Sequence, residues 1–154
     1  MEVERKDWVW ALTAHPPAEL KALADALAAD CEVRLTSLPQ AGLGLLQLAD
    51  GAFHEPYYLG EFPLSICRVE LALPDGRHIE GGAQAMADDA GLARALAILD
   101  ALLAAQWPGA ERAAALLETG ARLRAEEDRR RRAMLAATRV DFAVLNDAGE
   151  DDED

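Results

Sequence analysis

The chain has 154 residues, of which 51% are hydrophobic, and its formal net charge at pH 7 is -13. This length and apolar content fit a single domain with one core, because chains of this size bury about 68–70% of the surface that they expose when unfolded. An acidic chain of this kind is a poor candidate for direct nucleic-acid binding. The first residues lack the pattern of a secretory signal, and the most apolar window, residues 92–105, is too short to cross a membrane. We therefore expect a cytoplasmic protein.

The N-terminal part predicts two helices. Residues 8–12 fit a short helix that His15-Pro16-Pro17 interrupts, because proline removes a backbone donor and disfavours helix in the residue before it. A second helix begins at Pro17 and ends near Asp30, with apolar residues at positions 20, 23, 24 and 27 along one face.

The middle of the chain predicts four antiparallel strands. The predicted strands are residues 31–36, 43–49, 62–73 and 77–85. Turns at residues 39–42 and 74–76 separate the first pair and the last pair. The parity of the apolar residues changes at Leu45-Leu46, which predicts a bulge, and Gly81-Gly82 predicts either a bulge or a close approach of another element.

Two helices follow the strands. The first begins at Asp88 or Asp89, carries a leucine stripe that should cover the sheet, and ends at residues 107–109. The second, residues 110–138, would be roughly 44 Å long at 1.5 Å per residue, against a radius of gyration near 15 Å for a compact domain of this size. This helix should reach the edge of the domain or pass it. The order helices, strands, helices predicts an α+β fold in one domain, residues 1–146.

The C-terminal end combines an apolar segment with an acidic one. Arg139, Val140, Asp141 and Phe142 open a short β-like segment that another surface should cover, so we expect it to be an extended docking arm. Residues 147–154 contain six of the 28 acidic residues, which is typical of a disordered tail. Residues 129–132 are all arginine. They follow three acidic residues, so they form either a solvated helix face with i,i+4 ion pairs or a contact for an acidic partner or a phosphate-rich ligand.

Catalytic or metal-binding patterns do not stand out in the sequence. The three histidines lack the spacing of metal ligands, Cys31 and Cys67 are expected to be reduced core residues, and we nominate no catalytic residue, metal or cofactor. Gly60 and Glu61 stand where a carboxylate follows a glycine at the start of a long strand. This position suits close approach to a ligand or partner, although an exposed turn glutamate explains it equally simply.

A set of short motifs, in this order and spacing, resembles the PhnG family, subunits of the bacterial carbon-phosphorus lyase system. The similarity covers about residues 5–145. The motifs are residues 8–12, Glu19-Leu20, Tyr58-Leu59-Gly60-Glu61, Cys67-Arg68-Val69, Asp75-Gly76, residues 99–103 and Arg139-Val140-Asp141-Phe142.

The resemblance implies a cytoplasmic core complex with PhnH-, PhnI- and PhnJ-like subunits that degrades alkylphosphonates. In its first committed step a phosphonate displaces adenine from ATP, which gives α-D-ribose 1-methylphosphonate 5-triphosphate from methylphosphonate. The resemblance assigns the nucleosidase chemistry to the PhnI-like subunit and no catalytic residue to PhnG. The expected role is therefore an accessory subunit, in which Arg139 pairs with a partner carboxylate and residues 140–142 anchor the chain.

Two alternatives remain open from the sequence. The chain could supply part of the nucleotide or phosphonate site through Glu61 and Arg68 or through the arginine run. It could instead be a self-associating binding module unrelated to phosphonates, in which the long helix pairs two copies.

Overall fold

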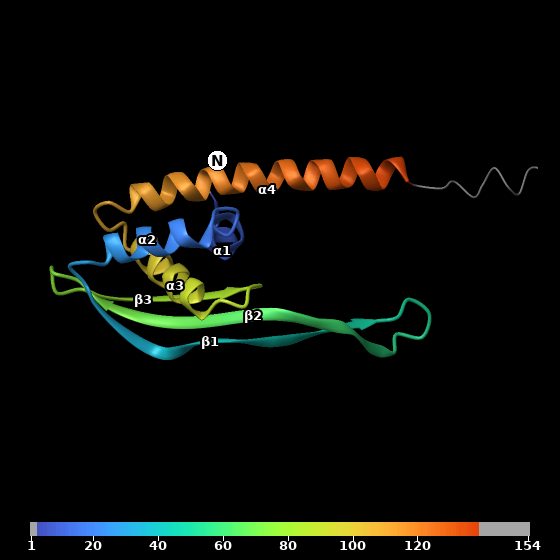
Figure 1. The fold of residues 1–154 in the computed structure, drawn as a ribbon, viewed down its shortest axis with the longest axis horizontal. Coiled ribbons are helices and arrows are strands. Elements are labelled where there is room, and N and C mark those ends of the chain that lie inside the picture. Colours follow the sequence, from blue (N-terminus) through green and yellow to red (C-terminus); the bar gives the residue numbers. More distant parts are fainter. Residues whose placement is uncertain (1–2, 139–154) are drawn as a thin grey trace, which may run out of the picture.

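The computed structural model describes residues 3–138, which form an α+β fold with a sheet on one side and helices on the other (Figure 1). A 3-10 turn, η1 (Arg5–Asp7), leads into α1 (Trp8–Leu12) and α2 (Pro17–Leu27). The strands are β1 (Glu32–Ala49), β2 (Pro56–Ala72) and β3 (His78–Ala85), and two helices complete the chain, α3 (Ala90–Ala104) and α4 (Glu111–Ala137). The predicted arm at residues 139–142 and the predicted tail at residues 147–154 lie outside the described residues.

The sheet has three antiparallel strands in the order β1-β2-β3, so the prediction of four strands was wrong. The two strands predicted at residues 31–36 and 43–49 are one continuous strand, and the predicted turn at residues 39–42 lies inside it. Pro39 is tolerated there because β1 is an edge strand, where a missing N–H costs no ladder hydrogen bond. Two register shifts, between Leu35 and Ser37 and between Ser37 and Gln40, absorb the irregularity as bulges.

The core lies between the inner face of the sheet and α3. Ser65, Cys67, Val69 and Leu71 alternate along β2 as its buried face, and α3 packs over them with almost every residue from position 92 to 102 buried. Asp89 is the N-cap of α3, since its carboxylate accepts the N–H of Leu92 at 2.9 Å, which confirms one of the two predicted caps.

Small residues allow the helices to approach their neighbours closely. A Cβ atom at Gly81 would lie 2.1 Å from the carbonyl oxygen of Ala97, so β3 passes directly against α3. This confirms the predicted close approach at Gly81-Gly82, where β3 keeps a regular register without a bulge. A Cβ at Gly120 would lie 2.0 Å from the carbonyl oxygen of Ala11, which places α4 directly on α1.

Candidate interaction surface

A buried carboxylate joins three elements at the edge of the sheet. Asp100 on α3 accepts two hydrogen bonds from the Arg5 guanidinium, at 2.9 and 2.7 Å, and a third from the backbone N–H of Gly82 on β3 at 3.0 Å. The hydrogen bond to Asp100 raises the pKa of Arg5, whose guanidinium also lies over the ring of Trp8, 5.9 Å from its centroid. The contact closes part of the β3 edge with side chains, which protects it from pairing with another strand.

A shallow groove of about 870 Å³ runs past this edge and includes Arg68. Its charged lining also contains Arg5 and Lys6, which pair with Asp100 and Glu4. Arg68 is exposed on the outer face of β2 and forms no ion pair with any residue of the described part of the chain. The groove therefore offers a mixed charge lining and one free guanidinium.

Gly60 and Glu61 lie far from Arg68 on the same strand. Both are exposed, and they pair across the ribbon with Leu46 and Leu45. Glu61 and Arg68 are seven residues apart along β2, which is roughly 23 Å at 3.3 Å per residue. The structure does not bring these predicted site residues together, so within one copy of the chain they cannot hold one small ligand between them.

The outer part of the β1–β2 hairpin extends well beyond β3. Pairing with β3 stops at Ser65, whereas β1 and β2 continue together to the pair Ala49–Pro56. We call residues 40–64 the hairpin arm. Its paired strands are roughly 25–30 Å long. In Figure 1 they run on past α1, α2 and α3, in the same direction as the outer half of α4.

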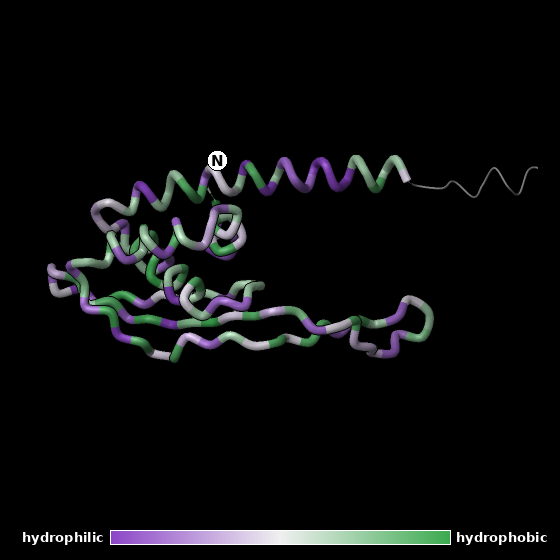
Figure 2. The backbone as a smooth tube through the Cα atoms, viewed as in Figure 1, coloured by the Kyte–Doolittle hydropathy of each residue, from purple (hydrophilic) through white to green (hydrophobic). Residues whose placement is uncertain are grey.

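Half of the exposed large apolar residues of the described chain lie on the hairpin arm. Hydrophobic segments, green in Figure 2, alternate with more polar ones along its strands. Phe53 at its tip is 81% exposed, and the tip is held by Asp50, whose carboxylate accepts the N–H groups of residues 52, 53 and 54. These N–H groups, led by that of Phe53, hold the pKa of Asp50 below its ordinary value. The other exposed large apolar residues of the arm are Leu43, Leu45, Leu46, Leu48, Tyr57, Tyr58 and Leu59.

The second extension is the C-terminal half of α4. His15 binds the carbonyl oxygen of Leu116 through Nε2 at 2.8 Å, and the Arg124 guanidinium donates to the carbonyl oxygens of Thr13 and Trp10 at 3.0 and 3.2 Å. These contacts attach the first half of α4 to the end of α1. Beyond them lies the helix extension, residues 125–137, which is roughly 20 Å long and contains no buried residue.

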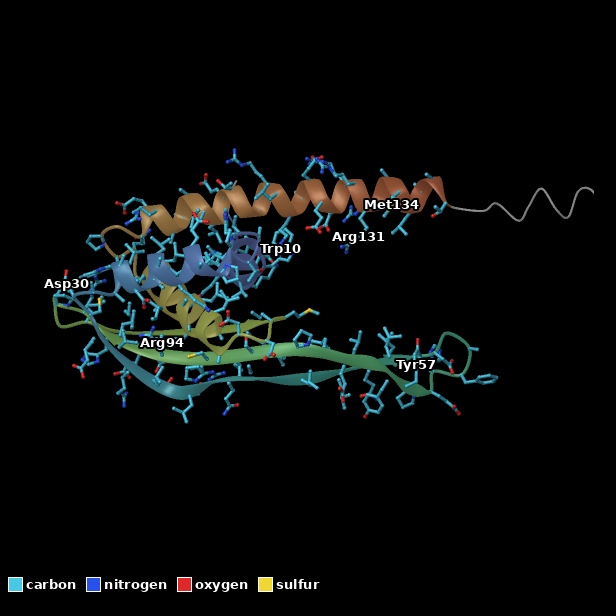
Figure 3. The ribbon with its side chains drawn as sticks, viewed as in Figure 1. Trp10, Asp30, Tyr57, Arg94, Arg131 and Met134 are labelled. Atoms are coloured by element: carbon cyan, nitrogen blue, oxygen red, sulfur yellow. The ribbon has the colours of Figure 1, made fainter. Side chains whose placement is uncertain are left out.

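Three of the four arginines of the run on the helix extension form ion pairs with glutamates of the same helix. Glu126 pairs with Arg129 and with Arg130, and Glu127 lies 3.9 Å from Arg131, which confirms two of the three predicted i,i+4 pairs. The hydrogen bond from Arg129 is the main cause that lowers the pKa of Glu126. Met134 and Leu135 follow this polar stretch and are 64% and 61% exposed. Figure 3 shows Met134 on the helix extension and Tyr57 on the hairpin arm, both away from the body.

The described residues hold no cluster of three or more His, Cys, Asp or Glu side chains arranged for a metal ion. Among residues 3–138, none of the helices combines the length and apolar character needed to cross a bilayer. The described structure presents two extensions on a compact body: an apolar hairpin arm and a largely charged helix extension with Met134 and Leu135 near its end.

Comparison with known proteins agrees with the motif order found in the sequence. The family model described as "Phosphonate metabolism protein PhnG" matches residues 3–146. The chain belongs to the PhnG family. It is also 33% identical over 142 residues to the "Alpha-D-ribose 1-methylphosphonate 5-triphosphate synthase subunit PhnG" of Rhizobium meliloti (strain 1021), an alignment that covers 92% of this chain and 88% of the relative. The resemblance to PhnG predicted from the sequence is thus confirmed.

Sequence reasoning missed two features that matter in this PhnG-family chain. The link from Asp100 to Arg5 could have been suspected, because a carboxylate within an otherwise apolar helix must find a partner. The hairpin arm also left a signal. In residues 43–48 leucine occupies both odd and even positions, so neither face of that strand is polar.

Proposed function

We propose that this chain is an accessory subunit of an α-D-ribose 1-methylphosphonate 5-triphosphate synthase of the carbon-phosphorus lyase system. In the reaction, a phosphonate displaces adenine from the ribose of ATP. The catalytic groups lie in the partner subunits, above all a PhnI-like nucleosidase-type subunit, with PhnH-like and PhnJ-like subunits in the same core complex. We place this reaction in the cytoplasm, where ATP is available.

The observation that carries this proposal is the bare apolar surface of the hairpin arm. A subunit that works alone in water rarely leaves so many leucine and tyrosine side chains uncovered along one element, whereas a permanent subunit interface resembles a core cut in half. Family membership indicates the enzyme system, and the exposed apolar surface indicates that the chain binds another subunit. We extend the docking surface to Arg139, Val140, Asp141 and Phe142, which follow the helix extension directly in the sequence.

The test is co-expression with the PhnI-like protein of the same organism, followed by size-exclusion chromatography with light scattering. The intact chain is compared with a chain that ends at Thr138. We expect the intact chain to co-elute with its partner and the shortened chain to bind more weakly. An intact chain that elutes as a monomer or homodimer beside free partner would refute the accessory role and favour a self-associating module.

A subunit-alone titration with ATP and methylphosphonate addresses the alternative in which this chain supplies part of the substrate site. We expect no binding to the isolated chain, because the structure separates Glu61 from Arg68 along the strand. Saturable binding that is lost in Arg68→Ala would contradict the purely accessory role.

A further inference from the structure

The hairpin arm exposes large apolar side chains on both of its faces. The pair Ala41–Ser65 continues the face that α3 covers, so Leu43 and Leu45, at alternate positions, lie on this inner face. Leu46 and Leu48 lie on the outer face. The inner pair is 68% and 60% exposed and the outer pair 43% and 38% exposed, so residues 3–138 leave both faces accessible at these positions.

The cross-strand partners repeat this arrangement. Tyr58 lies opposite Gln47 on the inner face, and Tyr57 lies opposite Leu48 on the outer face. Among its exposed leucines and tyrosines outside the bulge, each face therefore carries two leucines and one tyrosine. A partner that lay flat against one face would leave the other in water. A two-stranded ribbon is itself marginally stable in water and gains most when it is covered on both sides.

The charges of the arm restrict the partner. From residue 35 to residue 67 the chain contains no lysine or arginine, while Glu55 and Glu61 are exposed on the arm. Asp50 is engaged by the backbone of the tip and is less available. Two copies of the arm side by side would bring like charges together, which disfavours pairing of arms from two copies of this chain.

The tip of the arm is an organised turn that exposes an aromatic side chain. Asp50 fixes the turn, and His54 adopts a positive φ of 56° within it. This organised turn presents Phe53 at the far end of the ribbon, where an aromatic side chain can fill a pocket with little loss of conformational entropy. The direction of the arm and the position of Phe53 fit entry from the tip.

We propose that the hairpin arm inserts, tip first, into an apolar groove of another synthase subunit, whose walls contact both faces and carry lysine or arginine opposite Glu55 and Glu61. This inference rests on the proposed function and identifies the element that makes the contact and the chemistry of its receptor. Each groove of the partner subunit would hold a single hairpin arm, from one copy of this chain.

The test uses adjacent residues that point in opposite directions. A photo-crosslinking amino acid replaces Leu45 or Leu46 in the full chain, which is co-expressed with the other synthase subunits. A control variant carries the same amino acid at position 32, at the other end of β1. All three positions are exposed, so the substitutions leave the core intact. We expect Leu45 and Leu46 to crosslink to the same partner subunit with similar yield and Glu32 to give at most a tenth of that yield.

A crosslink from only one of the two leucine positions would overturn insertion and show docking of one face. Crosslinks between two copies of the chain would overturn it in favour of self-association. The two proposals fail separately. An intact chain that does not co-elute with any synthase subunit refutes the accessory role, whereas co-elution with both arm positions silent refutes insertion alone.

The charge of the groove wall is tested by reversal. Glu61→Arg should weaken the complex at least about 10-fold at low salt, and Glu61→Gln should weaken it less, because the first adds a repulsion and the second only removes an attraction. Both differences should shrink as salt rises. Equal affinity for Glu61→Arg and the parent chain would overturn the proposal that the groove carries a basic residue opposite Glu61.

Discussion

Replacing Gly81 and Gly82 one at a time tests how β3 is packed against α3. At Gly81 an added Cβ would lie 2.1 Å from the carbonyl oxygen of Ala97 and 2.8 Å from the Cβ of Ala101, both on α3. Ordinary contacts between such atoms are about 3.5 Å, so the helix and strand would have to separate by roughly 1 Å. At Gly82 the nearest atom would be the Cγ of Arg68 at 3.7 Å, which is an ordinary contact.

Gly81→Ala should lower the free energy of unfolding much more than Gly82→Ala. Overpacking of a core costs about 1–3 kcal/mol, and separation would also stretch the hydrogen bond from Gly82 to Asp100, which adds roughly 1 kcal/mol. We expect Gly81→Ala to lower the free energy of unfolding by about 3 kcal/mol, or Tm by about 6–12 °C. Gly82→Ala should lie within about 1 kcal/mol of the parent, because alanine restricts the unfolded chain without a clash.

Thermal unfolding followed by circular dichroism measures both variants under the same conditions. The two substitutions add the same methyl group to adjacent positions of one strand, so each controls for the other. A Tm for Gly81→Ala within 2 °C of both the parent and Gly82→Ala would refute the direct contact of β3 with α3 in solution (about 1 kcal/mol or less).

Two further predictions concern buried and half-buried carboxylates. Asp100→Ala should cost about 2–3 kcal/mol in urea unfolding, because it leaves an N–H of β3 without its acceptor and releases Arg5, whereas Asp25→Ala, in an exposed ion pair, should cost under about 0.5 kcal/mol. Similar costs for the two would contradict a structural role for the Arg5 contact. The hydrogen bond from Lys21, followed by an N–H of α3, holds the pKa of Asp89 below its ordinary value of 3.8. The stability from this lowered pKa is complete above pH 3.8 and is lost as pH falls through the folded-state pKa, so the cost of Asp89→Ala, about 1–2 kcal/mol near neutral pH, should shrink at lower pH. A cost independent of pH would show that the charge of Asp89 contributes nothing.

The helices and the clearest strands could be predicted because their signals are local. Proline at the first turn of α2, an aspartate cap before α3 and a turn at residues 74–76 each act within a few residues. The bounds of α4 were also predicted to within one residue: the structure has Glu111–Ala137, and the sequence predicted residues 110–138.

Local sequence signals could not predict that β1 is a single continuous strand. Pro39 and Gly42 are typical of a turn, and only the position of β1 at the edge of the sheet makes a proline there harmless. Which strand lies at the edge is decided by tertiary pairing and not by neighbouring residues. The predicted bulge at Leu45-Leu46 was nearly right, since the register shifts between Leu46 and Gln47, with the extra residue on β2.

The position of the tyrosine and phenylalanine residues also argues for a protein interface. The core uses small residues at its closest contacts, such as Gly81 against Ala97, and much of α3 is alanine. Both tyrosines of the chain, together with Phe53 and Phe62, lie instead in the stretch from the hairpin tip to the middle of β2. Tyrosine and phenylalanine are enriched where one protein contacts another, and they contribute most when a partner removes them fully from water. Alanine and leucine fill the core, whereas both tyrosines lie exposed on the hairpin arm. Among the described residues the largest remaining hydrophobic gain therefore lies in covering that arm, which supports the proposed accessory role.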